Sequence, residues 1–445
     1  MWPVWVCLGF LVGFASARLL PDIGPPVLTT SPAAPGRTTP APTLEPSLAT
    51  PEPPTPTPEP YIPCKDDPGL VPPPPPGPEG EPANYLHTCN GALYDSRGLL
   101  AQITGINWYG IEERSYAPGG LGVRNWKTIL AQIASMGFNS IRLPFSNDAL
   151  RPGAAPADID YELNPDLRGL SPLEIMDRIV AGARELGLKV ILDRHRPDSS
   201  GQSSFWYTAG VTEVQWIADW RMLARRYRGN DTVIGVDLHN EPAEGLTWGT
   251  GIPGTDWKMA AERAGNAVLE ENPYLLILVE GIYDYGDLFW WGGNLKGVRF
   301  AQVNLKIPNR AVYSPHDFGP GVYPQSWFSD PSFPANLEGV WDAHWGFIRK
   351  QGIAPVVVGE FGAHSTGADI EGTYQRKFVQ YLKQNGIGYL YWALNPDSPD
   401  SGGLLERDWE TPAGNKLELI STYQSPLIGI TATASLQVRP PVITP

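Results

Sequence analysis

Between about residues 83 and 423, short apolar runs alternate with longer segments in which apolar residues recur every three or four positions. The short runs are rich in β-branched and aromatic residues and predict strands, whereas the longer periodic segments predict amphipathic helices. This alternation predicts an α/β fold, a (β/α)8 TIM barrel with enlarged loops. A doubly wound sheet is the alternative, but no glycine-rich phosphate loop follows an early strand. The predicted strands are Leu100–Trp108, Ser140–Pro144, Lys189–Asp193, Ile234–His239, Leu275–Glu280, Val312–His316, Pro355–Glu360 and Gly388–Trp392. The predicted helices are Arg124–Met136, Ser171–Leu186, Val211–Arg228, Trp257–Glu271, Leu337–Gln351 and Thr373–Gln384.

The segments on either side of this region have a different character. Residues 1–17 are apolar and end in Ala-Ser-Ala, the small-residue pattern that precedes cleavage of a secretory signal peptide. Residues 18–82 are dominated by Pro, Thr, Ser and Ala and predict a disordered, extended Pro/Thr-rich spacer. Residues 424–445 have little periodicity and are expected to be peripheral or disordered. We therefore expect one globular domain, residues 83–423, in a secreted, extracellular protein, with an uncleaved N-terminal membrane anchor as the alternative.

Composition narrows the classes of partner. The chain carries 33 Lys and Arg against 47 Asp and Glu, a formal charge of -14, so nucleic acid and strongly anionic polymers are disfavoured as partners. Its 16 Trp and 18 Tyr offer flat rings that suit sugars as well as protein cores. Cys7 lies in the segment expected to be cleaved, which leaves Cys64 and Cys89 as the candidate disulfide. The cysteine spacing fits no zinc site, and we expect no metal or cofactor.

In a barrel of this type the active site lies where the strands end, so the informative residues are those that close an apolar run. Glu241 ends the fourth predicted strand and Glu360 the seventh, and these strands face each other across the barrel mouth. Two opposed carboxyls are what a glycosidase uses, because one donates a proton to the leaving oxygen and the other attacks the anomeric carbon. No GxSxG elbow and no HExxH motif occurs, which argues against serine hydrolase and zinc protease chemistry. The other strand-end residues are Asn107, Arg142, Asp193, Arg194, His195, Asn240, Glu280, His316 and Trp392.

Longer motifs around these residues indicate a family. The chain resembles glycoside hydrolase family five of clan A, and most closely its secreted endo-β-1,4-glucanases (cellulases) of the actinobacterial type. The resemblance implies a double displacement through a glycosyl-enzyme, with Glu241 as the general acid/base and Glu360 as the nucleophile. The motifs that carry it are Gly-Ile-Asn-Trp-Tyr-Gly at 105–110, Ile-Arg-Leu-Pro at 141–144, Leu-Asp-Arg-His-Arg-Pro-Asp at 192–198, Asp-Leu-His-Asn-Glu-Pro at 237–242, Trp-Trp-Gly-Gly-Asn at 290–294, Tyr-Pro-Gln-Ser-Trp-Phe-Ser-Asp-Pro at 323–331, Gly-Glu-Phe-Gly at 359–362 and Asn-Pro-Asp-Ser at 395–398.

The resemblance also implies roles for the residues around the two carboxylates. Asn240 would bind the 2-hydroxyl of the sugar that precedes the cleaved bond. Arg142 would keep Glu360 ionised and lower its pKa through charge and hydrogen bonds. His195 and His316 would bind sugar hydroxyls or orient the carboxylates.

Three tryptophans are candidate sugar platforms by the same resemblance. Trp392 would lie below the sugar that precedes the cleaved bond. Of Trp290 and Trp291, only one is expected to face the cleft, because adjacent residues on an extended strand point in opposite directions. By contrast, we interpret Glu280, Asp193 and His239 as structural hydrogen-bonding groups.

The chain departs from the family pattern at several positions. Phe318 stands where relatives have a tyrosine whose hydroxyl contacts the nucleophile, which would weaken the nucleophile unless another tyrosine supplies the group. The candidates for that substitution are Tyr313, Tyr283 and Tyr285. Positions where the nearest relatives have disulfide cysteines, or often a second tryptophan, hold Ser115, Ser199, Thr247, Thr250 and Leu394 instead.

The predicted partner is a β-glucan polysaccharide, and we expect a monomer with no obligate protein partner. Two alternatives stay open. The enzyme could cleave mannan, xyloglucan or mixed-linkage glucan, since one hydroxyl orientation or branch separates these polymers from cellulose. Alternatively, the chain could be a weakly active β-glucan-binding wall protein, which Phe318 and the long spacer would suit.

Overall fold

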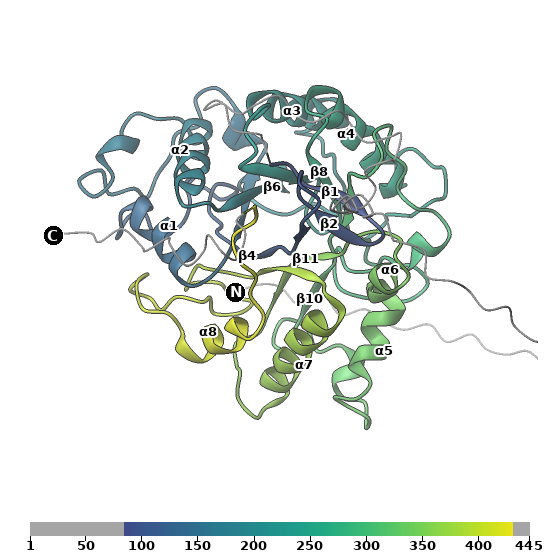
Figure 1. Cartoon of the computed structure of the whole chain (residues 1–445). Coiled ribbons are helices and arrows are strands. Elements are labelled where there is room, and N and C mark those ends of the chain that lie inside the picture. The colour runs from purple at the N-terminus through teal and green to yellow at the C-terminus, as the bar shows by residue number, and fades with distance from the viewer. Residues whose placement is uncertain (1–83, 430–445) are drawn as a thin grey trace, which may run out of the picture. The chain divides into compact units, whose positions relative to one another are not determined.

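The computed structural model describes residues 84–429. Within them a nine-stranded parallel sheet has the order β10-β11-β12-β4-β5-β6-β7-β8-β9, and Figure 1 shows helices arranged around its central strands. The strands are β4 (Thr104–Asn107), β5 (Ser140–Ser146), β6 (Lys189–Arg196), β7 (Val233–Asp237), β8 (Leu276–Val279), β9 (Ala311–Tyr313), β10 (His316–Phe318), β11 (Val357–Gly362) and β12 (Gly388–Tyr391).

The sheet closes on itself to form a barrel. β9 and β10 are two parts of one run interrupted at Ser314 and Pro315, and they pair with β8 and β11 respectively. The backbone N–H of Tyr313 donates to Pro355 O at 3.1 Å, which joins β9 to the segment that leads into β11. Counting β9 and β10 as one, the described residues form the eight strand positions of the predicted (β/α)8 barrel.

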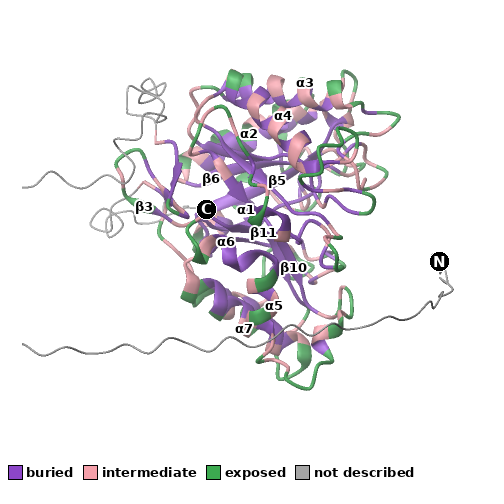
Figure 2. Cartoon of the chain, turned by 90° about the vertical axis from the view of Figure 1, so that its right-hand side faces the viewer, coloured by how far each residue is buried: buried purple, intermediate pink, exposed green. Residues whose placement is uncertain are grey.

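The helices cover the outside of this barrel. Figure 2 shows buried residues in the strands and exposed residues on the outer faces of the helices and loops, as expected for a parallel sheet covered on its outer face. The helices are α1 (Trp126–Ser135), α2 (Pro172–Glu185), α3 (Glu213–Arg226), α4 (Trp257–Glu271), α5 (Leu337–Trp341), α6 (Phe347–Lys350), α7 (Ile370–Asn385) and α8 (Gly414–Ser421). Within the described chain, no helix is long and apolar enough to cross a bilayer.

All six predicted helical segments contain helix, with three differences. The predicted helix Leu337–Gln351 is divided into α5 and α6 by a π-helical turn, η5 (Asp342–Gly346). Where a barrel helix would follow β8, the chain has the short 3-10 turn η3 (Lys296–Arg299). The helix α8 was not predicted, because eight residues give too few turns for a clear apolar period.

A small antiparallel sheet covers the end of the barrel at which the strands begin. It consists of β1 (His87–Cys89), β2 (Ala92–Tyr94) and β3 (Leu100–Ala101). The predicted strand Leu100–Trp108 is therefore wrong as a single element, since β3 belongs to this sheet and β4 to the barrel. Leu86 and Leu93 pack with Ile428 and with the lower interior of the barrel.

The predicted C-terminal boundary of the domain changes, and several other predicted features lie outside the described residues. Ile428 is 8% exposed, and Ser425 N donates to Thr104 Oγ1 at 3.0 Å, so the predicted boundary at residue 423 is too early. Cys89 is disulfide-bonded. Cys64, the signal peptide (1–17), the spacer (18–82) and residues 430–445 lie outside the described residues, and the Cys64–Cys89 pairing stays a prediction.

Candidate active site

Arg142 on β5 is the centre of a buried charge cluster where the strands end. Its side chain is fully buried, and its Nη1 donates to Glu360 Oε1 at 2.6 Å and to Asn107 Oδ1 at 3.0 Å. A guanidinium offers five N–H donors in a rigid fork, so one side chain fixes groups on several strands at once. Its other partners are Asp237 Oδ2 at 3.1 Å, Asn240 Oδ1 at 2.9 Å, Glu280 Oε1 at 3.3 Å and Asp193 Oδ1 at 3.1 Å.

His316 on β10 lies between the two predicted catalytic carboxylates. Its Nδ1 is 3.2 Å from Glu241 Oε1 and 3.7 Å from Glu360 Oε2. One carboxylate oxygen of Glu241 and one of Glu360 lie within 4.8 Å of each other. Carboxyl groups of retaining glycosidases are ~5–5.5 Å apart, whereas inverting enzymes leave ~6.5–9.5 Å to admit a water molecule. The spacing fits direct attack by a carboxylate.

The backbone and side chain of Glu241 are both held by named partners. Glu241 follows β7 with φ of +50°, which is uncommon for a residue other than glycine, and its N–H donates to Glu280 Oε2 at 2.8 Å. Gly292 makes room for that carboxylate, because a Cβ there would lie 2.1 Å from Glu280 Oε2. Gln202 Nε2 donates to Glu241 Oε2 at 2.9 Å, while His316 lies beside Oε1. Both oxygens of the predicted acid/base therefore have a partner.

The charge of Arg142 acts on Glu360 in the expected direction, since it lowers the pKa, but burial reverses the net direction. Burial raises the pKa of Glu360 well above its usual range, although the charges of His316 and Arg142 lower it. Glu360 is 3% exposed, and desolvation of the charged form outweighs the nearby cations. For His316, burial lowers the pKa, but the charges of Glu280 and Glu360 raise it well above the usual value. Both ring nitrogens face carboxylates, because Nδ1 lies 3.2 Å from Glu241 Oε1 and Nε2 lies 3.2 Å from Glu280 Oε1.

His195 at the end of β6 is held as a neutral ring. Burial, followed by the charge of Arg142, lowers the pKa of His195 well below its usual value. Its Nδ1 is 2.6 Å from Asp193 Oδ2, so a neutral ring donates Nδ1–H there and leaves Nε2 as an acceptor. Asp193 thus orients His195 and also pairs with Arg142, which is the structural role expected of it.

The three candidate sugar platforms differ in exposure. Trp392 is 7% exposed and stacks against both Tyr109 and His195, at ring-centroid distances of 5.2 Å and 5.4 Å. Its peptide bond to Ala393 is cis. Trp290 is 1% exposed, whereas Trp291 is half-buried and lines a hollow of about 330 Å³ beside Glu241. Of the adjacent pair, only Trp291 borders the open space next to the acid/base. The contact of Trp392 with sugar stays a prediction.

Carboxylates and imidazoles near the strand ends also form three overlapping groups, within the described residues, that could ligate a metal ion. Every group contains a carboxylate that is ion-paired with Arg142. A divalent cation would therefore have to compete with the guanidinium that already balances these charges. The groups are Asp193 with His195 and Glu360, Asp237 with Glu280 and His316, and Glu241 with His316 and Glu360.

The structure adds supporting residues that the sequence reasoning did not assign. Gln202 lies in the loop after β6, and no strand-end signal pointed to it. Asn107 on β4 links its strand to β11 and β12, because its Nδ2 donates to Gly359 O at 3.0 Å and lies 3.1 Å from Leu390 O. Glu280 was expected to be structural, and its bonds to the Glu241 backbone and to Arg142 place it directly behind the acid/base.

Three of the four positions that lack cysteine make contacts between hydroxyl groups instead. Thr247 Oγ1 and Thr250 Oγ1 are 2.8 Å apart, so a hydrogen bond links these two positions. Ser199 Oγ is 3.1 Å from the hydroxyl of Tyr116. These contacts tie the loops of the barrel mouth without a covalent bond.

Comparison with known proteins agrees with this geometry. Residues 99–398 match the family described as cellulase, glycosyl hydrolase family 5. The chain is 48% identical over 355 residues to an endoglucanase of Paenibacillus polymyxa, and the match covers 79% of this chain and 89% of the relative. It is 41% identical over 351 residues to the major extracellular endoglucanase of Xanthomonas campestris pv. campestris, covering 77% of this chain and 72% of the relative.

Solved structures give the same assignment. The catalytic domain of the Xanthomonas endoglucanase has a TM-score of 0.72 at 41% identity, with 76% of this chain and 99% of that chain covered. A variant of an endocellulase from Pyrococcus horikoshii in complex with cellotetraose has a TM-score of 0.73 at 38% identity, with coverage of 76% and 98%. The protein therefore belongs to glycosyl hydrolase family 5. Within that family it is similar to endoglucanases.

Proposed function

We propose that the protein is a secreted endo-β-1,4-glucanase that cleaves internal bonds of cellulose or related β-glucans with retention of configuration. The observation that carries the mechanism is the spacing of the carboxylates, with one oxygen of Glu241 within 4.8 Å of one oxygen of Glu360. The substrate class rests on the relatives, which are named endoglucanases and of which one is called extracellular.

In this proposal each step uses groups that are already in place. Glu360 attacks the anomeric carbon while Glu241 gives its proton to the leaving oxygen, so that the glycosidic bond breaks and an ester to Glu360 forms. Arg142 and protonated His316 lie beside the nucleophile and balance its charge before attack. Glu241 then takes a proton from water, which attacks the ester and releases Glu360. Two inversions at the anomeric carbon give net retention.

Substitution of each carboxylate tests this assignment. We expect Glu360→Ala to abolish turnover of all substrates. Glu241→Ala should spare formation of the glycosyl-enzyme from aryl cellobiosides with good leaving groups, because those need no protonation. Azide should then restore turnover in Glu241→Ala and give a β-glycosyl azide. An α-glycosyl azide from this variant would contradict the retaining mechanism.

The polysaccharide is tested separately from the mechanism. Release of reducing ends from carboxymethyl cellulose, barley glucan, mannan and xyloglucan ranks the candidate substrates, and we expect the first two to be cleaved fastest. A β-glucan-binding wall protein is the second candidate, because Phe318 lies where a nucleophile contact is expected. That protein would bind cellulosic substrates without releasing phenolate from an activated aryl cellobioside.

A further inference from the structure

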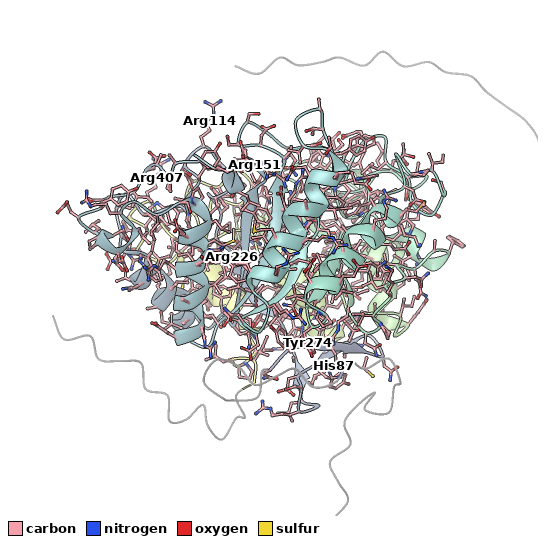
Figure 3. The ribbon with its side chains drawn as sticks, turned by 90° about the horizontal axis from the view of Figure 1, so that it is seen from above. His87, Arg114, Arg151, Arg226, Tyr274 and Arg407 are labelled. Atoms are coloured by element: carbon pink, nitrogen blue, oxygen red, sulfur yellow. The ribbon has the colours of Figure 1, made fainter. Side chains whose placement is uncertain are left out.

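A groove lies beside the barrel mouth, above β12 and β4, and the catalytic steps do not use it. It has a volume of about 530 Å³, within the range of ligand-binding sites. Its lining residues are Pro396, Asp397, Ser398, Gly402, Arg407 and Trp409. Figure 3 shows Arg407 toward the end of the molecule where Arg114 and Arg151 also lie, opposite His87 in the sheet that covers the other end.

The groove has one aromatic wall that is built into the fold. The ring of Trp409 rests on the backbone of Gly119 and Gly120, where a Cβ would lie 2.6 Å and 2.5 Å from ring atoms. Trp409 has a φ of +58°, in the left-handed region that a bulky residue rarely adopts. The backbone N–H of Trp409 donates to Glu406 O at 2.8 Å, and its backbone carbonyl accepts from the side chain of Arg124. The strained turn is therefore held at both ends. The indole is half-buried, and its free surface borders the groove.

Polar groups with free hydrogen-bonding capacity complete the groove. Asp397 is exposed, and its Oδ1 accepts from the hydroxyl of Tyr109 at 2.8 Å. Arg407 is also exposed and lines the groove. A flat ring beside acceptors and donors is what a sugar with an apolar face and equatorial hydroxyls requires.

The groove is connected to the catalytic centre through a chain of contacts. His195 Nδ1 lies 3.9 Å from Glu360 Oε1, and His195 stacks on Trp392, which stacks on Tyr109. The hydroxyl of Tyr109 then reaches Asp397 in the groove. The path therefore leads from the nucleophile over β12 and β4, whereas the hollow beside the acid/base Glu241 is formed by loops that follow β6, β7 and β8.

The direction of the path decides which part of the substrate would lie there. The leaving group must lie on the side of the residue that protonates it, and the sugar that forms the ester extends away from that residue. We propose that the groove binds glucose units on the non-reducing, glycone side of the glucan, beyond the sugar that is attacked. This inference rests on the proposed function and extends it by a distal sugar subsite formed by Trp409, Asp397 and Arg407.

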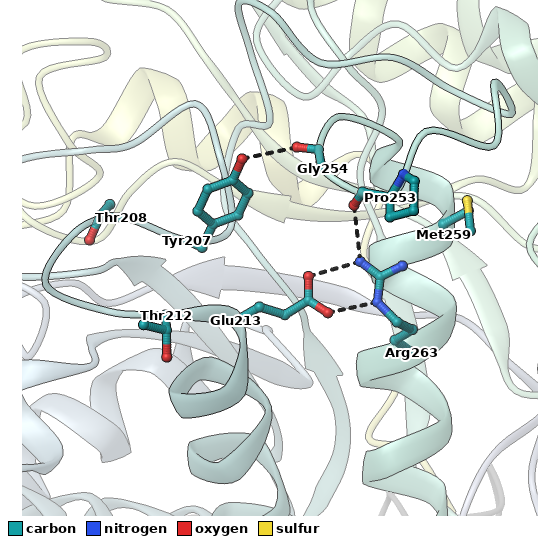
Figure 4. A pocket seen from close by; sticks show the side chains of 8 residues that line it. All are labelled: Tyr207, Thr208, Thr212, Glu213, Pro253, Gly254, Met259 and Arg263. Carbon is teal, nitrogen blue, oxygen red and sulfur yellow. Dashed lines mark hydrogen bonds and ion pairs between the residues drawn. The ribbon is translucent and has the colours of Figure 1, made fainter.

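A second open groove, shown in Figure 4, offers a contrast. It has a volume of about 620 Å³ and lies between the start of α3 and the start of α4. Its polar groups are already satisfied, because the Tyr207 hydroxyl donates to Gly254 O at 3.0 Å and Arg263 pairs with Glu213 at 2.7 Å. Its aromatic hydroxyl and its charged pair are therefore already engaged, and Tyr207 provides an aromatic control away from the barrel mouth.

The test uses full-length protein and a series of aryl β-cello-oligosaccharides that share one aglycone and differ only in the number of glucose units. We expect Trp409→Ala and Arg407→Ala to leave kcat/KM unchanged for the short members and to lower it about three- to tenfold once the glycone is long enough to reach the groove. Tyr207→Ala should show no such dependence on length. Arg407 is exposed, so its variant keeps the test valid if loss of the Trp409 ring weakens the fold.

The outcomes separate the inference from the function on which it rests. A loss that is equal at every length, or no loss at any length, would overturn the distal subsite while the enzyme still cleaves β-glucans. A loss that appears only when sugars are added on the leaving-group side would also overturn it. If the unsubstituted enzyme hydrolysed none of the series, the proposed function itself would fail.

Discussion

Replacing Phe318 with tyrosine tests the electrostatics of the nucleophile. Phe318 lies on β10 two residues after His316, so both side chains point to the same face of the sheet. β10 pairs in parallel with β11, with His316 opposite Glu360 and Phe318 opposite Gly362. Phe318 is therefore a diagonal neighbour of Glu360, a separation that an aromatic side chain can bridge. It is 3% exposed and packs edge-on against Trp290, with the ring centroids 6.1 Å apart.

The tyrosines that could supply the missing hydroxyl have other contacts. The Tyr313 hydroxyl accepts from Val303 N at 2.9 Å and is thereby turned away from the mouth. Tyr283 stacks on Trp291 at a ring-centroid distance of 6.1 Å. The ring of Tyr285 lies beside Gly297. We therefore expect Glu360 to lack a phenol donor in this protein.

The magnitude follows from the strength of a hydrogen bond to a charged group. Such a bond contributes about 1.5–3 kcal/mol, and one pKa unit corresponds to about 1.36 kcal/mol. Burial raises the pKa of Glu360, so the fraction of ionised nucleophile falls as the pH drops through that raised value. A hydroxyl that donates to the ionised form stabilises it and therefore lowers this pKa. Phe318→Tyr should therefore move the acidic limb of kcat/KM to lower pH and raise turnover on cellulosic substrates.

The assay is kcat/KM on an aryl cellobioside as a function of pH, with thermal unfolding measured in parallel. Phe328→Tyr is a matched control, because Phe328 is 6% exposed and packs against Phe333 and Tyr374 rather than in the catalytic centre. It should cost stability without moving the acidic limb. An unmoved limb with unchanged or lower activity in Phe318→Tyr would refute the account of a weakened nucleophile.

Three further predictions concern other parts of the molecule. Gln202→Leu removes a donor to Glu241 and should lower kcat/KM about tenfold on cellulosic substrates but far less on a dinitrophenyl cellobioside, which needs no protonation. Arg142→Met leaves buried carboxylates unpaired and should cost about 3–5 kcal/mol of unfolding free energy at neutral pH. The loss should shrink as the pH falls, because the carboxylates then take up protons; urea unfolding at two pH values checks this. A chain that begins at Ala83 lacks Cys64 and should fold and cleave soluble substrate; a loss of about 2–4 kcal/mol in urea unfolding would show that the disulfide is structural.

The barrel could be predicted from the sequence because its strands are buried on both faces and read as short apolar runs. The predictions that were wrong concern segments whose position depends on contacts with distant parts of the chain. Leu100–Trp108 looks like one run, yet Leu100 and Ala101 pair with β2, whereas the pairing with β12 begins at Thr104 and that with β5 at Gly105. Ile428 lies in a tail without periodicity and becomes buried only because the barrel end offers it an apolar surface.

The site residues also divide into those that the sequence predicts and those that only the fold reveals. Strand ends gave Glu241, Glu360 and Arg142, because side chains at the ends of parallel strands converge on the barrel mouth. Gln202 lies in a loop, and loops have no period that would place their side chains. Trp409 likewise became a candidate only because the fold places its ring on Gly119 and in the lining of the same groove as Asp397.

The raised pKa of Glu360 shows why an interpretation based on the Arg142–Glu360 pair alone was insufficient. Arg142 beside a carboxylate predicts a lowered pKa, but the fold buries several carboxylates around the same guanidinium. Burial raises the pKa of Glu280 to about 8 and that of Asp237 to about 7, and both lie within hydrogen-bonding distance of Arg142. A proton taken up by one of these groups changes the charge felt by the others, so they titrate together. The acidic limb of the rate profile is consequently a property of this network, and Phe318→Tyr acts on it by stabilising one ionised member rather than by setting the pKa of Glu360 alone.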